Sequence, residues 1–229
     1  MKKQNKKIVF IVLFSLFGLL ALQISVSRII GSTQNFTLFD FFAPTTGLFL
    51  NSFPGLVSIL LVKLFDLIFI KKAIDLVSIL RLLPLPLAAF YFGSKSKSKS
   101  LIAILCMILF ISHPIGRQAW IYSLYWLIPL IASFFPKRLF LKALGSTFTA
   151  HAVGSTVFLY TIGLTPQVWL GLISVTFVER FSFAVGIYAS YFILNFCLNF
   201  IVNLLKIQNI NFLIKKEYLP SKKFILKYS

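Results

Sequence analysis

Long apolar runs with few charges between them limit what this chain can fold into. The runs cover approximately residues 8–30, 45–70, 73–92, 100–112, 117–135, 139–163 and 169–205. An α-helix needs about 20 apolar residues to cross the hydrocarbon core of a bilayer. We therefore predict an all-α fold: a polytopic integral membrane bundle of six transmembrane helices, or seven. The fourth run is short, and the last is long enough to span and then follow the surface.

The scarcity of charge excludes the water-soluble fold classes. Charged residues make up 12% of the chain, about half of their usual share in a soluble domain. The runs are also too long and too uniformly apolar for the strands of an outer-membrane barrel. We expect one transmembrane domain over 1–229, with a basic N-terminus (1–7), a helical bundle (8–205) and a basic tail (206–229). The first run continues to Ile30, so we interpret it as an uncleaved first helix.

The basic residues predict the orientation. The net charge is +18, which in a soluble protein would indicate a nucleic-acid partner. Here Lys and Arg gather at the termini and between apolar runs, as expected for cytoplasmic loops attracted to anionic lipids. We therefore expect a plasma-membrane protein with both termini in the cytoplasm and no nucleic-acid partner. The three Lys-poor loops, 32–46, 112–118 and 163–167, are then outside.

Two further basic segments lie between apolar runs. The low-complexity stretch SKSKSKS (94–100) looks like a flexible cytoplasmic connector. Lys71 and Lys72 break the pattern, because they cannot be inside if 94–100 is inside and both neighbouring runs span. Either the 45–70 run is partly re-entrant, or one short Lys loop lies outside.

The stretch LGSTFTAHAVGSTVFLY (144–160) places polar side chains inside an apolar run. Residues four apart share a helix face, so Thr147, His151 and Ser155 form a stripe, with Gly154 and Phe158 alongside. A histidine at membrane depth is costly unless it is partnered. The stripe is either a tight helix seam, which small residues favour, or the wall of a polar cavity.

A second polar position matches His151 in depth. If 163–167 is the turn of a helical hairpin centred near Thr165, His151 lies 14 residues before the centre and Glu179 lies 14 after it. Antiparallel helices of equal rise then bring both to one layer, together with Arg180. The layer is either a structural ion-pair network or a site for a ligand or proton.

Aromatic residues follow the second external loop. Arg117 lies in that loop, Trp120 comes directly after it, and Tyr122, Tyr125 and Trp126 share one face if the helix is continuous. These residues are either an aromatic belt at the membrane interface or the lining of a site for a planar or anionic ligand.

Further candidate residues lie in the first helix and in the loop that follows it. Asp40 is the only acid on the proposed outer side and sits among phenylalanines that either enter lipid or cap a cavity. Gly18, Ala21 and Ser25 form a small-residue face on the first helix. Such faces dock other helices, within the fold or from a partner.

Four features together resemble the substrate-binding (S) component of energy-coupling factor (ECF) vitamin transporters. They are the chain length, the basic termini, the segment NFTLFDFFAPTTGLFLNSFPG after the first helix, and the pair Ala21 and Ser25. The resemblance implies a six-helix membrane protein that binds a small nutrient in an outward-opening pocket, partly covered by the loop after helix one. It also implies docking to a transmembrane coupling subunit that works with ATPases.

These patterns favour membrane transport, with the chain as a solute-binding subunit that performs no chemistry. The expected ligand-binding residues are those singled out above: Arg117, Trp120, Tyr125, Trp126, Thr147, His151, Glu179 and Asp40. Two alternatives stay open: a membrane enzyme that uses His151 and Glu179 as an acid–base pair, and a structural protein of the envelope. We expect no metal and no cofactor, because Cys106 and Cys197 lie inside apolar runs and acids are few.

Overall fold

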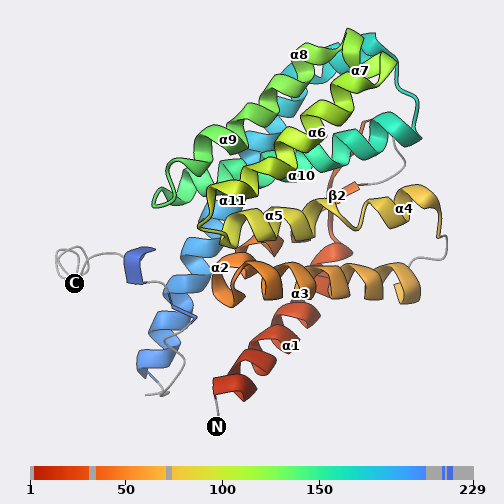
Figure 1. Cartoon of the computed structure of the whole chain (residues 1–229). Helices are drawn as coiled ribbons and strands as arrows, with labels where there is room; N and C mark the ends of the chain where they lie inside the picture. The colour runs from red at the N-terminus through yellow and green to blue at the C-terminus, as the bar shows by residue number, and fades with distance from the viewer. Residues whose placement is uncertain (1–2, 31–34, 71–73, 205–212, 215, 219–229) are drawn as a thin grey trace.

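The fold is described from a computed structural model of the chain (Figure 1), which describes residues 3–30, 35–70, 74–204, 213–214 and 216–218. Lys71, Lys72 and most of the tail 206–229 lie outside the described residues. The first half contains α1 (Lys3–Leu22), β1 (Ser25–Arg28), β2 (Asn35–Thr37), η1 (Leu38–Phe41), η2 (Ala43–Thr45), α2 (Thr46–Leu50), α3 (Ser52–Phe65), η3 (Asp66–Ile70), α4 (Leu76–Leu80), α5 (Pro84–Gly93) and η4 (Lys97–Ser100). The second half contains α6 (Leu101–Ser112), α7 (Pro114–Gln118), α8 (Trp120–Ser123), η5 (Leu124–Trp126), α9 (Leu127–Ser133), α10 (Leu139–Thr161), α11 (Pro166–Leu204) and η6 (Lys216–Tyr218).

The prediction of an all-α fold is confirmed, with one small hairpin, β1–β2, as the strand content of the described residues. Three helical stretches in the described part are long and apolar enough to cross a membrane: Ser52–Ile70, Leu76–Gly93 and Pro166–Phe200. They are compatible with a multi-pass membrane protein, and they are fewer than the six or seven spans expected. Shorter apolar helices cover Lys7–Leu22, Leu38–Leu50 and Trp120–Ser133.

The first helix ends earlier than predicted. The expectation that it continues to Ile30 is wrong, because α1 ends at Leu22 and the chain then forms β1. Ile24 and Val26 are β-branched and suit a strand. β1 pairs antiparallel with β2, with Arg28 opposite Asn35. The strand partner lies at residues 35–37, so the pattern of residues 8–30 alone does not contain this information.

Helix α5 lies at the centre of the helical stack, with α3 on one side and α10 on the other (Figure 1). The side of α10 away from α5 is covered by α6, α9 and α11. Where α2 crosses α5, both helices carry glycine. A Cβ on Gly93 would clash with the Gly47 carbonyl, and a Cβ on Gly47 would clash with the Ala89 carbonyl. The two backbones can approach this closely because neither glycine has a side chain.

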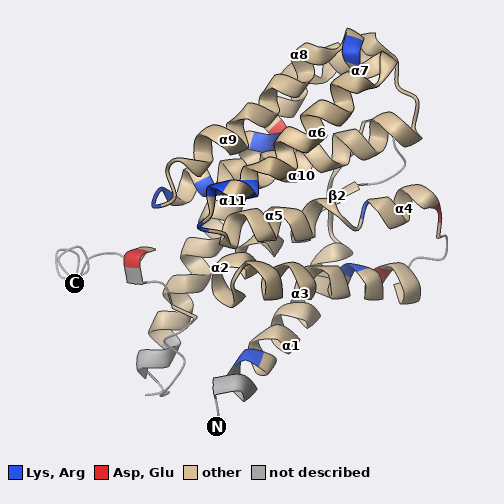
Figure 2. Ribbon diagram, viewed as in Figure 1, with Lys and Arg blue, Asp and Glu red and all other residues tan. Residues whose placement is uncertain are grey.

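The basic loops at residues 94–100 and 136–142 lie together at one end of the bundle. The Lys97 ammonium is 4.8 Å from the centroid of the Phe134 ring, which joins η4 to the end of α9, and Figure 2 shows Lys and Arg concentrated there. Residues 94–100 are more ordered than a flexible connector. Lys99 is 1% exposed, donates a hydrogen bond to the Ser94 carbonyl at 3.1 Å and lies 4.3 Å from the centroid of the Tyr91 ring.

The Lys-poor loops meet at the opposite end. The His113 ring lies 5.0 Å from the Tyr160 ring, so the loop between α6 and α7 is beside the end of α10. Ile29, from the end of the hairpin, and Leu164, from the turn between α10 and α11, pack against the same core cluster. Gly163 adopts φ +68°, a left-handed conformation that ends α10 and is natural for glycine.

Candidate functional site

A cavity at the Lys-poor end of the bundle is the candidate site. The space open to the centres of water-sized molecules is about 130 Å³, room for on the order of ten waters. Its walls come from α10, α11, the end of α4 with the start of α5, and the cap formed by the hairpin and η1. The site therefore joins segments that are far apart in the sequence.

Helix α10 contributes one wall through a stripe of helical period. The lining residues of this helix recur every three or four positions: Thr147, Ala150, His151, Gly154, Ser155 and Phe158. The stripe contains the Thr147, His151 and Ser155 face expected from the sequence. Gly154 leaves open space, since a Cβ there would meet only Pro84, at 3.8 Å. This face of α10 therefore borders a cavity over part of its length.

Helix α11 contributes a second stripe of the same kind, formed by Leu172, Val175, Thr176, Glu179, Arg180 and Phe183. Glu179 and His151 both line the cavity, and Arg180 acts electrostatically on His151. Glu179 accepts a hydrogen bond from the Arg180 guanidinium at 2.7 Å. The Arg180 guanidinium carbon also lies 4.6 Å from the ring centroids of both Phe36 and Phe183. Two aromatic rings thus hold this cation at the cavity wall.

The cap lines the cavity with Phe36 and Asp40. Asp40 accepts hydrogen bonds from the backbone N–H and the hydroxyl of Thr37, at 2.7 and 2.8 Å. These bonds fix the start of η1 and orient the carboxylate. Asp40 also acts electrostatically on Arg81, which enters the cavity wall between α4 and α5.

The phenylalanines on either side of Asp40 hold the cap to the helices. Phe39 is fully buried and packs so closely on Gly18 that a Cβ there would lie 2.8 Å from its ring. Phe41 stacks on Phe183 of α11, with ring centroids 4.5 Å apart. The cap is therefore packed against the first and the last long helix.

Three hydrogen bonds define the state of the His151 ring. The Trp126 indole donates to His151 Nδ1 at 3.0 Å. An indole N–H can only donate, so Nδ1 carries the lone pair and the proton of the neutral ring is on Nε2. Nε2 is 2.7 Å from the Tyr122 hydroxyl and 3.2 Å from the Ser155 hydroxyl. It donates to these oxygens.

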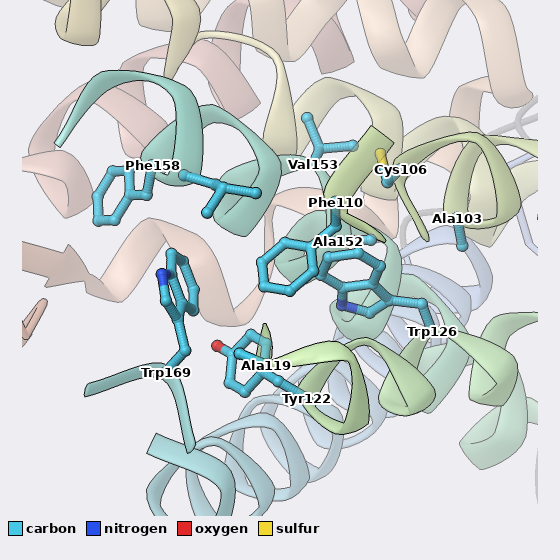
Figure 3. Packing of buried hydrophobic residues seen from close by; sticks show 11 residues of the cluster. Ala103, Cys106, Phe110, Ala119, Tyr122, Trp126, Ala152, Val153, Phe158 and Trp169 are labelled. Atoms are coloured by element: carbon cyan, nitrogen blue, oxygen red, sulfur yellow. The ribbon is translucent and has the colours of Figure 1, made fainter. Parts of the chain in front are cut away.

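Tyr122 extends this hydrogen-bond network to α11. Its hydroxyl lies 3.4 Å from the Ser155 hydroxyl and 3.3 Å from the Thr176 hydroxyl, and it lines the cavity. Tyr122 is buried beside Phe110, Trp126 and Trp169 (Figure 3). The Phe110 ring lies 5.2 Å from those of both tryptophans and is nearly perpendicular to them. This aromatic cluster supports the cavity from behind.

The cavity wall contains hydrogen-bond donors that have no acceptor. Among the described residues, the buried atoms Arg81 Nη1, Trp169 Nε1 and Arg180 Nε have no hydrogen-bond partner, and all three side chains line the cavity. Buried polar groups are normally hydrogen-bonded, because an unmet donor is costly. The acids of the wall, in contrast, each accept at least one hydrogen bond from this chain.

The predicted site residues divide into two groups. The cavity brings together Asp40, Thr147, His151 and Glu179. Arg117 and Trp120 are exposed and are not among its lining residues. The Tyr125 hydroxyl donates to the Ile173 carbonyl at 3.0 Å, and Trp126 lies behind His151. The expected stacking residues therefore support the site or lie outside it.

The predicted docking face of the first helix is mostly used within the chain. Gly18 contacts Phe39, as described above, and Ala21 is 1% exposed. Ser25 lies in β1, not on the helix, and accepts a hydrogen bond from the Asn35 side chain at 3.1 Å.

Sequence reasoning missed Lys63, Arg81 and Trp169, which line the cavity, and did not include Tyr122 and Arg180 among the site residues. Lys63 and Arg81 each lie inside an apolar run that contains one further charge, Asp66 and Asp75 respectively. An ionisable residue inside a membrane helix is by default a functional-site signal, so this signal was present in the sequence.

The described residues contain no group of three or more His, Cys, Asp or Glu side chains that could hold a metal ion. No protein-family model, no curated protein and no solved structure matches this sequence. The cavity therefore provides the basis for considering function.

Proposed function

We propose that this chain is a membrane protein that binds a small solute in the cavity between α10, α11 and the cap, as the binding subunit of an uptake transporter. The observation that supports the proposal is the cavity itself, with room for a guest of about ten non-hydrogen atoms. Its lining combines apolar walls with a few polar groups, which is typical of small-molecule sites.

The distribution of charge supports an outward-facing site. The two basic loops share one end of the bundle, and Lys-rich loops stay in the cytoplasm. Two of the Lys-poor loops border the cavity at the other end, 32–46 through Phe36, Asp40 and Pro44, and 163–167 through Leu164. In this arrangement the termini are cytoplasmic, the bundle crosses the plasma membrane six or seven times, and the cavity faces outward. A transmembrane coupling subunit with ATPases would supply the energy.

The geometry gives less support to an enzyme. A general base needs a free lone pair, and the Nδ1 lone pair of His151 accepts the Trp126 indole proton. Within the described part of the chain, the hydrogen bonds of His151 go to Trp126, Tyr122 and Ser155, not to Glu179. His151 in this tautomer orients Tyr122 at the cavity wall.

Filling the cavity tests the proposal. Gly154→Leu adds a side chain to the cavity wall with little steric conflict, and Gly171→Leu adds the same side chain on α11, where a Cβ would meet nothing within 4 Å. We expect native mass spectrometry of the gently solubilised protein to detect a small molecule bound to the wild type and to Gly171→Leu, but not to Gly154→Leu. Equal occupancy of all three proteins, or no bound molecule in any of them, would refute solute binding in this cavity.

A further inference from the structure

We infer that the cavity recognises a small organic anion, an apolar body that carries one carboxylate, and that Arg81 and Arg180 bind the carboxylate. This inference rests on the proposed function, because it specifies the class of solute. It starts from the three buried donors without acceptors, Arg81 Nη1, Arg180 Nε and Trp169 Nε1. They come from two segments that are far apart in the sequence, the end of α4 (Arg81) and α11 (Trp169 and Arg180), and meet at one cavity.

A cavity with unmet donors needs a guest that accepts hydrogen bonds. A carboxylate is the natural complement, since it has two acceptor oxygens and no proton to donate. Arginine suits it particularly well, because the guanidinium presents several N–H groups in a planar arrangement. A water molecule also accepts, but it brings two protons that need acceptors of their own. An ammonium group would only add donors.

The charges at the wall favour an anionic guest over a cationic one. Of the lining residues, Lys63, Arg81 and Arg180 are cationic, and Asp40 and Glu179 are anionic. Both acids already accept hydrogen bonds, Asp40 from Thr37 and Glu179 from Arg180, whereas Arg81 and Arg180 keep buried donors without acceptors. A carboxylate meets these donors with a single negative charge, whereas a phosphate brings more than one charge.

The remaining lining describes the rest of the guest. Apolar side chains make up much of the remaining lining, among them Pro84, Leu85, Phe158, Leu164 and Leu172. They would bury an aliphatic or aromatic body, while the hydroxyls of Tyr122 and Thr176 could orient a neutral polar substituent. The expected ligand thus has one acidic end and a mainly apolar body.

The test uses three probes of nearly equal shape: 3-phenylpropionate, its neutral amide and the cation 3-phenylpropylamine. Binding to the full chain in detergent is measured by thermal stabilisation and by tryptophan fluorescence, at millimolar probe concentrations. We expect the carboxylate to bind at least about tenfold more tightly than the amide, the ratio that one charge-assisted hydrogen bond provides. We expect no detectable binding of the amine.

Arginine variants identify the binding groups. Arg81→Gln and Arg180→Gln should each weaken carboxylate binding roughly tenfold to hundredfold. Arg81→Lys should restore only part of it, because lysine keeps the charge without the planar donor pair. Arg117→Gln is the matched control, since Arg117 is exposed and not among the lining residues, and it should bind like the wild type. Each variant must first melt cooperatively without probe, so that a folding defect is recognised.

The outcomes separate this inference from the proposed function. Equal or tighter binding of the amide or amine would overturn the carboxylate assignment and leave solute binding intact, as would carboxylate binding unchanged in both cavity arginine variants. Inorganic phosphate, measured in the same way, should bind more weakly than the carboxylate, and preferred binding of phosphate would also overturn the assignment. If none of the probes binds, the assignment falls, and the Gly154→Leu comparison decides whether solute binding falls with it.

Discussion

Replacing Trp126 with phenylalanine removes one hydrogen-bond donor from the His151 ring while leaving an aromatic ring in the core. Trp126 is fully buried and its indole donates to His151 Nδ1 at 3.0 Å. A buried acceptor that loses its donor costs about 1–3 kcal/mol, and the space left by the smaller ring adds roughly 1 kcal/mol. We therefore expect Trp126→Phe to lower stability by about 2–4 kcal/mol.

Thermal unfolding of the solubilised protein measures this loss. For a chain of this length, 1 kcal/mol corresponds to a shift in melting temperature of about 2–4 °C, so we expect a decrease of roughly 5–15 °C. Trp120→Phe is the control, because Trp120 is 49% exposed, and surface substitutions usually stay within about 0.5 kcal/mol.

Nitrogen NMR of histidine-labelled protein tests the mechanism separately from the energy. The chain has two histidines, His113 and His151, so each ring can be assigned by substituting the other. In the wild type we expect His151 to carry its proton on Nε2 alone. In Trp126→Phe the Nδ1 lone pair is released, and a mixture of the two neutral tautomers should appear. A wild-type ring protonated on Nδ1, or equal melting of the two tryptophan variants, would show that the Trp126 bond does not control His151.

Two further predictions concern the basic end and the α2–α5 crossing. Burial lowers the pKa of Lys99 to about 8 from the ordinary 10.5; the unfolded chain then binds more protons between these values, so stability should rise as pH rises through them. Lys99→Met should flatten the rise in melting temperature with pH, and an unchanged slope would contradict the burial argument. Gly93→Ala should destabilise by about 1–3 kcal/mol, because its Cβ meets the Gly47 carbonyl. Gly171→Ala, in open space, should stabilise by up to about 1 kcal/mol in the same melting assay; similar effects of both would argue against the close crossing.

Helical periodicity predicted the part of the site that lies on long regular helices. The stripe on α10 follows from residues three and four apart, and the presence of His151 and Glu179 at one cavity follows from their equal distances to a turn. Both arguments use only local geometry. They apply because α10 and the first half of α11 are regular on either side of Gly163.

The same argument misplaced the aromatic residues because their segment is not one regular helix. The chain leaves helical geometry at Ala119, and residues 124–126 form the 3-10 turn η5. A 3-10 turn advances 120° per residue instead of 100°, which shifts directions by about 60° over three residues. Tyr122 therefore reaches the cavity, while the Tyr125 hydroxyl bonds to Ile173 and Trp126 turns behind His151.

Other features depend on contacts that no local pattern contains. The end of α1 at Leu22 is set by a strand partner beyond residue 30. The order of η4 comes from Lys99, which covers the Tyr91 ring from the next segment of the chain. Arg81 shares a cavity with the cap and α11, and no local pattern places these segments side by side.

The turn η1 has a consequence for how the cavity can change shape. Successive residues of a 3-10 helix point about 120° apart, and three neighbours here meet three different parts of the molecule. Phe39 packs on α1, Asp40 lines the cavity, and Phe41 stacks on α11. The turn therefore acts as a rigid pivot between the first and the last long helix. A tilt of either helix moves the Asp40 carboxylate, so the width of the cavity and the angle between these helices change together.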